Sequence, residues 1–352
     1  MNYINFHKVA LTVVSVVGIS IASTAVARDL TIVSWGGAFQ EAQREINFKP
    51  FSELINKPVL DNSWDGGIGV LQAKTLNAEP DWDVVEVEGD ELIIGCADGL
   101  FEELDWERLG GRESYIKESV HDCGIGNIVY SQGISYDGDR INHETGPRSW
   151  ADFWDIEKFP GKRSLRRGPK YTLEYALLAD GVEPDELYDV LRTEEGVARA
   201  FKKLDEIKPH FVWWDSPAQS LQLVASGQVA MASQFNGRIT TLNQTENKNF
   251  KFIWDDSIYT LDYWVILKGS PNKEEAMDFI VYSSKPEVQA KLPAYIPYGT
   301  TNKDAGRLVA EEYQRDLPTE PSNMNVGVPM DIDFWVDEIE PLTQIFDAWV
   351  AR

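Results

Sequence analysis

The sequence contains few of the residues that build metal and redox centres. Among 352 residues there are only four His and two Cys, which leaves little material for a zinc or iron–sulfur site. Basic residues are scarce too, because 33 Lys and Arg stand against 57 Asp and Glu, a formal net charge of −24. A chain without a basic surface to neutralise phosphates is not expected to bind nucleic acid. We therefore expect no metal, no other cofactor and no nucleic-acid partner.

Motifs of catalysis are also missing. The sequence has no Gly-x-Ser-x-Gly elbow, no His-Glu-x-x-His pair and no phosphate-binding P-loop. His121 lies two residues before Cys123, but a catalytic thiol needs a separate base in space, and Cys96 is the better partner for this thiol. Acid pairs such as Glu86 and Glu88 are expected at the solvated surface in a chain with 57 acids. No catalytic residue is predicted.

Long hydrophobic runs are absent as well, since no segment reaches the ~20 apolar residues needed to span a bilayer. Near the N-terminus, Lys8 is followed by the apolar run 9–21 and by Ala-Val-Ala at 25–27, a small-x-small pattern. A basic start, an apolar run of about 7–15 residues and such a site are typical of a secretory signal peptide. We expect residues 1–27 to be removed by cleavage after Ala27, which leaves an exported chain. An uncleaved N-terminal anchor is the alternative.

Export gives the two cysteines a role. Cys96 and Cys123 are an even pair in a chain expected in an oxidising compartment, where disulfides form and persist. We predict a disulfide between them that closes a loop of about 27 residues and adds ~3 kcal/mol of stability in the chain-entropy model. Two buried free thiols are the alternative.

Strands and helices alternate along the whole chain. Residues 28–35 have the composition of a buried strand, Gly36 and Gly37 end it, and residues 38–53 carry apolar side chains at helical spacing. The pattern continues with strands predicted at 82–87, 128–130, 211–214, 229–232 and 263–267, and with helices predicted at 149–154, 217–225 and 333–349. Without a repeat or a flexible linker, this order predicts two α/β lobes that share strands, with the chain crossing between them more than once.

The chain is rich in aromatic residues, with 12 Trp and 13 Tyr. Many of them fall at the ends of predicted strands or at the starts of loops: Trp35, Trp64, Trp213, Trp214, Phe235, Tyr263, Trp264 and Tyr298. Ligands of open α/β sheets bind outside the carboxyl ends of the strands. Aromatic faces beside carboxylates attract small organic cations by cation–π interaction and ion pairing. The segments around Trp35, Glu88 and Asp262 have this form and indicate an amine site, with core packing as the alternative for each aromatic taken singly.

Six segments, in a fixed order, carry a resemblance to a known family. They are Leu-Thr-Ile-Val-Ser-Trp-Gly-Gly at 30–37, Trp-Asp-Val-Val at 82–85, Ser-Trp-Ala-Asp-Phe-Trp-Asp at 149–155, Lys-Phe-Pro-Gly-Lys-Arg at 158–163, Trp-Trp-Asp-Ser at 213–216 and Phe-Asn-Gly-Arg at 235–238. Through these segments the chain resembles the spermidine/putrescine-type periplasmic solute-binding proteins of ABC importers. The resemblance covers essentially its whole mature length. The resemblance implies a type II bilobal periplasmic-binding-protein fold, an α/β fold with a hinge and a ligand cleft between two lobes.

The resemblance also implies lobe limits, a ligand site and partners. Residues 28–134 and 256–352 would form the first lobe, and residues 135–255 the second. Carried over by position, the ligand-binding residues are Trp35, Glu88, Tyr171, Phe235, Asp262 and Tyr298; Arg238 and the strand-end aromatics Trp214 and Trp264 complete the predicted site. The implied partners are a small amine or onium ligand and the inner-membrane permease subunits of an importer, and the receptor itself is expected to be a periplasmic monomer.

One residue departs from the family pattern. Polyamine binders carry an acid shortly after the aromatic that corresponds to Phe235, whereas this chain has Arg238. A guanidinium in the cleft would repel a diamine and would hold a carboxylate through two hydrogen bonds. Our main prediction is a receptor for a putrescine- or spermidine-like amine. The alternative is a zwitterionic ligand whose carboxylate binds Arg238, such as 4-aminobutyrate, a betaine or dimethylsulfoniopropionate.

The polyamine prediction depends on where Arg238 points. If this side chain leaves the cleft or pairs with Asp215, it places no positive charge beside the ligand. An enzyme on the same fold is a less favoured reading, because the sequence offers no positioned nucleophile–base pair and no cofactor motif to support it.

Overall fold

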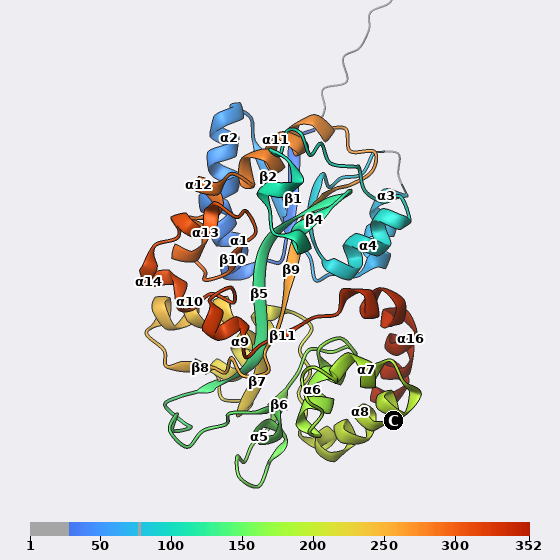
Figure 1. Ribbon diagram of the computed structural model, residues 1–352, viewed down its shortest axis with the longest axis vertical. Helices are drawn as coiled ribbons and strands as arrows, with labels where there is room; N and C mark the ends of the chain where they lie inside the picture. Colours follow the sequence, from blue (N-terminus) through green and yellow to red (C-terminus); the bar gives the residue numbers. More distant parts are fainter. Residues whose placement is uncertain (1–27, 77–78) are drawn as a thin grey trace, which may run out of the picture.

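The computed structural model describes residues 28–76 and 79–352. The predicted signal peptide lies outside the described residues. Within them, no helix is both long enough and apolar enough to cross a membrane. Figure 1 shows two α/β halves, one above the other, joined by the long strands β5 (Gly124–Asp137) and β9 (Ile258–Ile266). We call the half built from residues 30–97 and 273–283 the first lobe, and the half built from residues 150–252 the second lobe.

A mixed sheet runs through both lobes. In the described part of the chain it has 11 strands in the order β2-β1-β3-β9-β5-β7-β6, with β4, β8 and β10 paired to β5 and β11 paired to β9. The other strands are β1 (Leu30–Ser34), β2 (Val59–Ser63), β3 (Val84–Glu88), β4 (Val120–His121), β6 (Arg163–Ser164), β7 (Met231–Phe235), β8 (Phe250–Phe252), β10 (Gly299–Thr300) and β11 (Val328–Pro329).

The first lobe places helices on both faces of its strands. Strands β1 and β3 are parallel and fully buried, as expected for apolar strands covered on two sides. Phe51 of α2 (Lys49–Ile55) and Phe279 of α11 (Lys273–Ser283) pack on one face. Leu92 of α4 (Gly89–Ala97) packs on the other.

Strands β5 and β9 join the lobes. The first part of β5, Gly124 to Gln132, pairs with β9, and the part from Gln132 to Tyr136 pairs with β7 of the second lobe. Strand β9 also pairs with β3 of the first lobe. The lobes therefore share strands, and the chain crosses between them more than once, as predicted.

The second lobe is mostly helical. Its short helix α5 (Trp150–Trp154) begins as predicted at Ser149, whose hydroxyl accepts a hydrogen bond from the N–H of Asp152 at 3.2 Å. The remaining helices of the protein are α1 (Gly37–Gln43), α3 (Ile68–Thr75), α6 (Thr172–Ala179), α7 (Leu187–Leu191), α8 (Glu194–Ile207), α9 (Pro217–Ala225), α10 (Asn236–Glu246), α12 (Pro286–Gln289), α13 (Ala305–Leu308), α14 (Glu311–Gln314), α15 (Pro321–Met324) and α16 (Ile332–Val350), with single turns η1 (Arg44–Phe48), η2 (Arg112–Ser114), η3 (Lys117–Ser119), η4 (Lys208–His210) and η5 (Leu292–Ala294).

The C-terminal helix α16 contacts both lobes. Its side chains Trp335, Phe346 and Trp349 belong to the buried cluster that forms the core of the second lobe. Near its N-terminus, Ile332 lies against Gly89 of α4. The end of the chain thus packs mainly on the second lobe, whereas residues 256–352 were predicted to belong to the first. The other lobe limits stay a prediction.

Two predicted elements differ from those observed. The helix expected at 38–53 is divided by the π-helical turn η1, because Pro50 has no N–H to continue the regular ladder. The strand expected at 211–214 forms only isolated bridges to residues 163 and 166. Its partner β6 has only two residues, so the pairing does not extend into a ladder.

Candidate ligand-binding site

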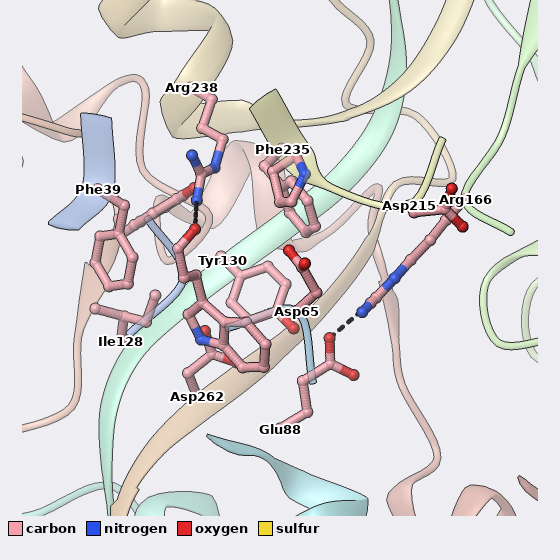
Figure 2. A pocket seen from close by; sticks show the side chains of 13 residues that line it. Phe39, Asp65, Glu88, Ile128, Tyr130, Arg166, Asp215, Phe235, Arg238 and Asp262 are labelled. Atoms are coloured by element: carbon pink, nitrogen blue, oxygen red, sulfur yellow. Dashed lines mark hydrogen bonds and ion pairs between the residues drawn. The ribbon is translucent and has the colours of Figure 1, made fainter. Parts of the chain in front are cut away.

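A pocket lies between the lobes, lined by residues of both. Six of its lining residues belong to the predicted site: Trp35, Glu88, Phe235, Arg238, Asp262 and Tyr298. Seven more were not predicted: Phe39, Asp65, Ile128, Tyr130, Arg166, Asp215 and Pro217. Figure 2 shows charged side chains from both lobes around a group of aromatic rings.

The turn after β1 brings the two lobes into contact. Gly36 and Gly37 have φ angles of 63° and 60°, which glycine adopts without strain. A Cβ atom on Gly37 would lie 2.7 Å from Nη1 of Arg238. Only glycine therefore allows this arginine of α10 to reach the backbone that follows β1.

Arg238 is buried in the pocket and has only neutral partners. Arg238 is 3% exposed, and its Nη2 atom donates to the carbonyl oxygens of Trp35 and Gly36 at 3.2 Å each. It makes no ion pair with Asp215 or with any other acid in the described ranges 28–76 and 79–352. Burial raises the pKa of Glu86, and the charge of Arg238 partly offsets this rise, but the two residues form no ion pair. A buried cation without an ion pair is costly, so this guanidinium remains available to an anionic group of a ligand.

Asp262 is the matching anionic position. It lies on β9 opposite Glu88 of β3 and Ile128 of β5, and it is 4% exposed. Its Oδ1 atom has no hydrogen-bond partner among the residues described. Burial, together with the negative charges of Glu86 and Glu88, raises the pKa of Asp262 well above its ordinary value. A cation bound beside Asp262 would stabilise its ionised form and lower its pKa.

Glu88, in contrast, is already neutralised. Its Oε1 atom accepts a hydrogen bond from Arg166 at 2.7 Å, and its Oε2 atom forms an ion pair with Lys170. Burial raises the pKa of Glu88, but the charges of Arg166 and Lys170 outweigh this effect and lower the pKa to about 2. Lys170 also pairs with Asp90 at 2.7 Å. These contacts leave little negative charge on Glu88 for a ligand.

Glu86 lies behind the pocket in a hydrogen-bonded cluster. Ser34 Oγ, Gln43 Nε2 and Asn127 Nδ2 lie 2.6, 2.8 and 2.7 Å from its carboxylate oxygens. Burial raises the pKa of Glu86 to about 7. The expectation that Glu86 and Glu88 lie at the solvated surface is therefore wrong, because neighbouring polar and basic side chains satisfy both acids inside the protein.

Aromatic rings form the apolar walls. Trp35 stacks on Trp64 with ring centroids 5.2 Å apart. Tyr130 meets Phe235 and Tyr298 edge to face, at 5.5 and 6.2 Å. Such walls can pack on a methylene chain and can attract an ammonium group by cation–π interaction.

Three predicted residues do not line the pocket. Tyr171 stands behind it, with its hydroxyl 3.1 Å from that of Tyr130. Trp214 also stands behind it and packs edge to face on Phe235 at 6.0 Å. Trp264 packs on Phe279 in the core of the first lobe. All three are fully buried.

The predicted disulfide lies outside the pocket. Cys96 and Cys123 are bonded, with their Cα atoms 5.8 Å apart. His121, the partner considered for a Cys–His pair, only accepts a hydrogen bond from the N–H of Cys123 through Nδ1 at 3.2 Å. The two cysteines therefore connect α4 to the start of β5.

Comparisons with known proteins agree with this architecture. Residues 64–319 match the family model of bacterial extracellular solute-binding proteins. The chain is 42% identical over 340 residues, 96% of each chain, to a gamma-aminobutyric acid-binding protein of Pseudomonas aeruginosa. It is 24% identical over 277 residues, 72% of this chain and 74% of the other, to a putrescine-binding periplasmic protein of the same species.

Solved structures show the same likeness. A periplasmic binding protein of A. tumefaciens in complex with glucopine superposes with a TM-score of 0.86 at 30% identity, over 92% of this chain and 100% of that one. A solved GABA receptor structure superposes with a TM-score of 0.80 at 33% identity, over 92% and 98%. These relatives are transport components and not enzymes. The chain thus belongs to the bacterial extracellular solute-binding protein family and is a substrate-binding component of an ABC importer.

Proposed function

We propose that this protein binds a short ω-amino carboxylate, with 4-aminobutyrate as the model ligand, and delivers it in the periplasm to an inner-membrane ABC permease. One observation carries the proposal: a single pocket holds a buried arginine without an acidic partner and a buried aspartate without a basic one. Arg238 binds the carboxylate of the ligand, and Asp262 binds its ammonium group.

The charges around the pocket favour this zwitterion over a diamine. A diamine needs an anionic group at each end, but Glu88 is occupied by Arg166 and Lys170. Arg238 would also lie close to one ammonium group of a diamine and repel it. The polyamine ligand, our main expectation from the resemblance, is therefore the less favoured of the two.

The shape and polarity of the pocket also distinguish among zwitterions. The methylene chain of an ω-amino acid packs between the rings of Trp35, Tyr130 and Phe235. A primary ammonium can donate a hydrogen bond to the unpartnered Oδ1 of Asp262. Betaines and sulfonium carboxylates have no N–H to donate, so they would leave that oxygen unsatisfied.

Sequence relatives support the same ranking. The relative at 42% identity and the solved structure at 33% identity are both described as binding GABA. The putrescine- and spermidine-binding relatives are between 21% and 24% identical to this chain.

Closure of the two lobes on the ligand provides the transport signal. Arg238 of the second lobe contacts backbone carbonyls of the first, and a carboxylate bound at Arg238 lies at this interface. A ligand that touches both lobes favours the closed state by its higher affinity for that state. The permease then recognises the closed receptor.

A ligand screen tests the proposal. Thermal-shift and calorimetric titrations of the mature protein would compare 4-aminobutyrate with putrescine, spermidine, glycine betaine and dimethylsulfoniopropionate. We expect 4-aminobutyrate to bind and to add about 2.7 kcal/mol of stability at 100 times its dissociation constant, a shift of several degrees in Tm. Binding of the diamines alone would refute the proposal and restore the polyamine prediction.

A further inference from the structure

A second hollow lies directly beside the ligand pocket. It lies between α4, the segment 166–170 and α16. The two hollows share three lining residues, Asp65, Glu88 and Arg166. The side chains of these residues therefore separate the ligand pocket from a larger space in the same interlobe cleft.

An ion pair across the cleft forms the centre of this boundary, which we call the wall. Arg166 of the second lobe reaches Glu88 of the first at 2.7 Å, along one side of the pocket (Figure 2). Their side chains are 20% and 9% exposed. Lys170 holds Glu88 from the far side and pairs with Asp90 as well.

The backbone that carries these bases is held in an unusual conformation. Tyr171, directly after Lys170, has φ 68° although it is not glycine, and backbone strain of this kind persists where the surroundings hold it, often at functional sites. Its hydroxyl lies 3.1 Å from that of Tyr130 in the pocket. Thr172 Oγ1 donates to the carbonyl oxygen of Arg166 at 3.0 Å. Arg166 is therefore held by Thr172 on its own lobe and by Glu88 on the first lobe.

We propose that the Glu88–Arg166 wall limits the length of the ligand. This inference rests on the proposed function, because it assigns a length limit to the same ω-amino carboxylate site. A ligand of the length of 4-aminobutyrate, held at Arg238 and Asp262, leaves the wall intact, whereas a longer chain would have to displace an ion pair that closes the pocket. The space behind the wall is lined by polar groups of both signs, among them Glu91, Arg167 and Asp347, so it can take the charged end of a longer chain once the wall is open.

The test is a chain-length series measured on the wild type and on the Arg166→Ala variant. The probes are ω-amino carboxylates from 4-aminobutyrate to 8-aminooctanoate, and α,ω-diamines from four to eight carbons. We expect the wild type to bind 8-aminooctanoate about 100-fold more weakly than 4-aminobutyrate. In Arg166→Ala this ratio falls to about tenfold or less, because the longer chain extends into the second hollow.

Two further variants keep the test decisive. Glu88→Gln combined with Arg166→Ala removes both charges of the pair together, so that neither is left buried alone; it must show the same shift in length preference. Arg167→Ala is the matched control, because Arg167 is the next residue, lines only the second hollow and does not contact Glu88. Its length profile is expected to match that of the wild type.

The outcomes separate this inference from the proposed function. If only the diamines bind, the ω-amino carboxylate proposal fails. The length limit is then tested by comparing how the affinity for diamines depends on chain length in the wild type and in the Arg166 variants. If both Arg166 variants keep the wild-type length profile, or weaken all chain lengths equally, the wall does not limit length and the inference is overturned.

Discussion

Arg166 and Arg238 line the same pocket from different sides, yet their partners differ in kind. Arg166 is 2.7 Å from the carboxylate of Glu88, and Lys170 adds a second cation to that acid. Arg238 donates only to two backbone carbonyl oxygens. The first guanidinium is ion-paired within the protein, and the second forms no ion pair with the described residues.

This difference indicates which end of the pocket binds ligand charge. A buried charge that has a partner of opposite sign is part of the folded structure. Removing one partner destabilises the protein, because the other charge is then buried without compensation. A buried charge without such a partner is costly until a ligand supplies it. Burial alone would make both arginines candidate ligand contacts; only their partners distinguish them.

The largest effect is expected at the unpaired end. In Arg238→Gln the carboxylate of 4-aminobutyrate loses its cationic partner in a desolvated site, and we expect affinity to fall by about 100-fold or more. Calorimetric titration measures this directly. Arg166→Gln is the matched change at the paired end and should cost less. Equal losses in the two variants would show that the contrast between the arginines has no functional meaning.

The second effect concerns the acid opposite Arg238. Burial raises the pKa of Asp262 and a bound ammonium group lowers it again, so ligand binding is coupled to the release of protons from this carboxyl group. Proton release on binding means that affinity rises with pH until Asp262 is ionised in the free protein. Asp262→Asn should bind about 30-fold more weakly and should lose most of this pH dependence.

Titration calorimetry between pH 5.5 and 8, in buffers of different ionisation enthalpy, measures both the affinity and the protons released. Glu86, whose pKa is raised to about 7 by burial, remains in the Asp262→Asn variant and accounts for any residual slope. A wild-type affinity that does not change with pH would contradict the assignment of Asp262 to the ammonium group.

A smaller loss is expected for the aromatic wall. Trp35→Ala removes a ring that lines the pocket and stacks on Trp64, and we expect affinity to fall about tenfold. Trp264→Phe is the control, because Trp264 lies in the core of the first lobe and its change should lower Tm without altering affinity. Wild-type affinity in Trp35→Ala would remove this tryptophan from the site.

The sequence predicted the fold and the strand-end residues of the pocket because both depend on local patterns. Trp35 and Phe235 lie directly after or at the end of β1 and β7, where turn residues mark the strand end in the sequence. Arg238 follows within one turn of α10. Their meeting in one pocket follows from the order of the strands, which the family resemblance supplied.

The remaining pocket residues depend on how the lobes pack. Tyr130 lies in the middle of β5, and nothing in its neighbours marks it as a pocket residue and not a core residue. Trp264 and Asp262 are two residues apart on β9 and share a face of the sheet, but α11 covers Trp264 through Phe279 while Asp262 opens to the pocket. The Arg166–Glu88 pair joins residues 78 positions apart and could not be predicted from spacing.

The smallest effect is expected for Lys170, which supports the paired end without lining the pocket. Lys170→Met removes ion pairs to Glu88 and Asp90 that join the second lobe to the first. Glu88 keeps Arg166, and Asp90 lies in the first turn of α4, where the helix dipole favours an acid. The closed state is therefore weakened modestly, and affinities for all ligands should fall about threefold while their ranking stays the same. Calorimetry across the ligand panel measures the affinities and their ranking. Small-angle scattering of the ligand-free protein measures how far the closed state is weakened. If the ranking of ligands changes, Lys170 influences ligand choice. The Glu88–Arg166 end of the pocket would then contribute to ligand recognition as well as to structure, and its contrast with the Arg238 end would be wrong.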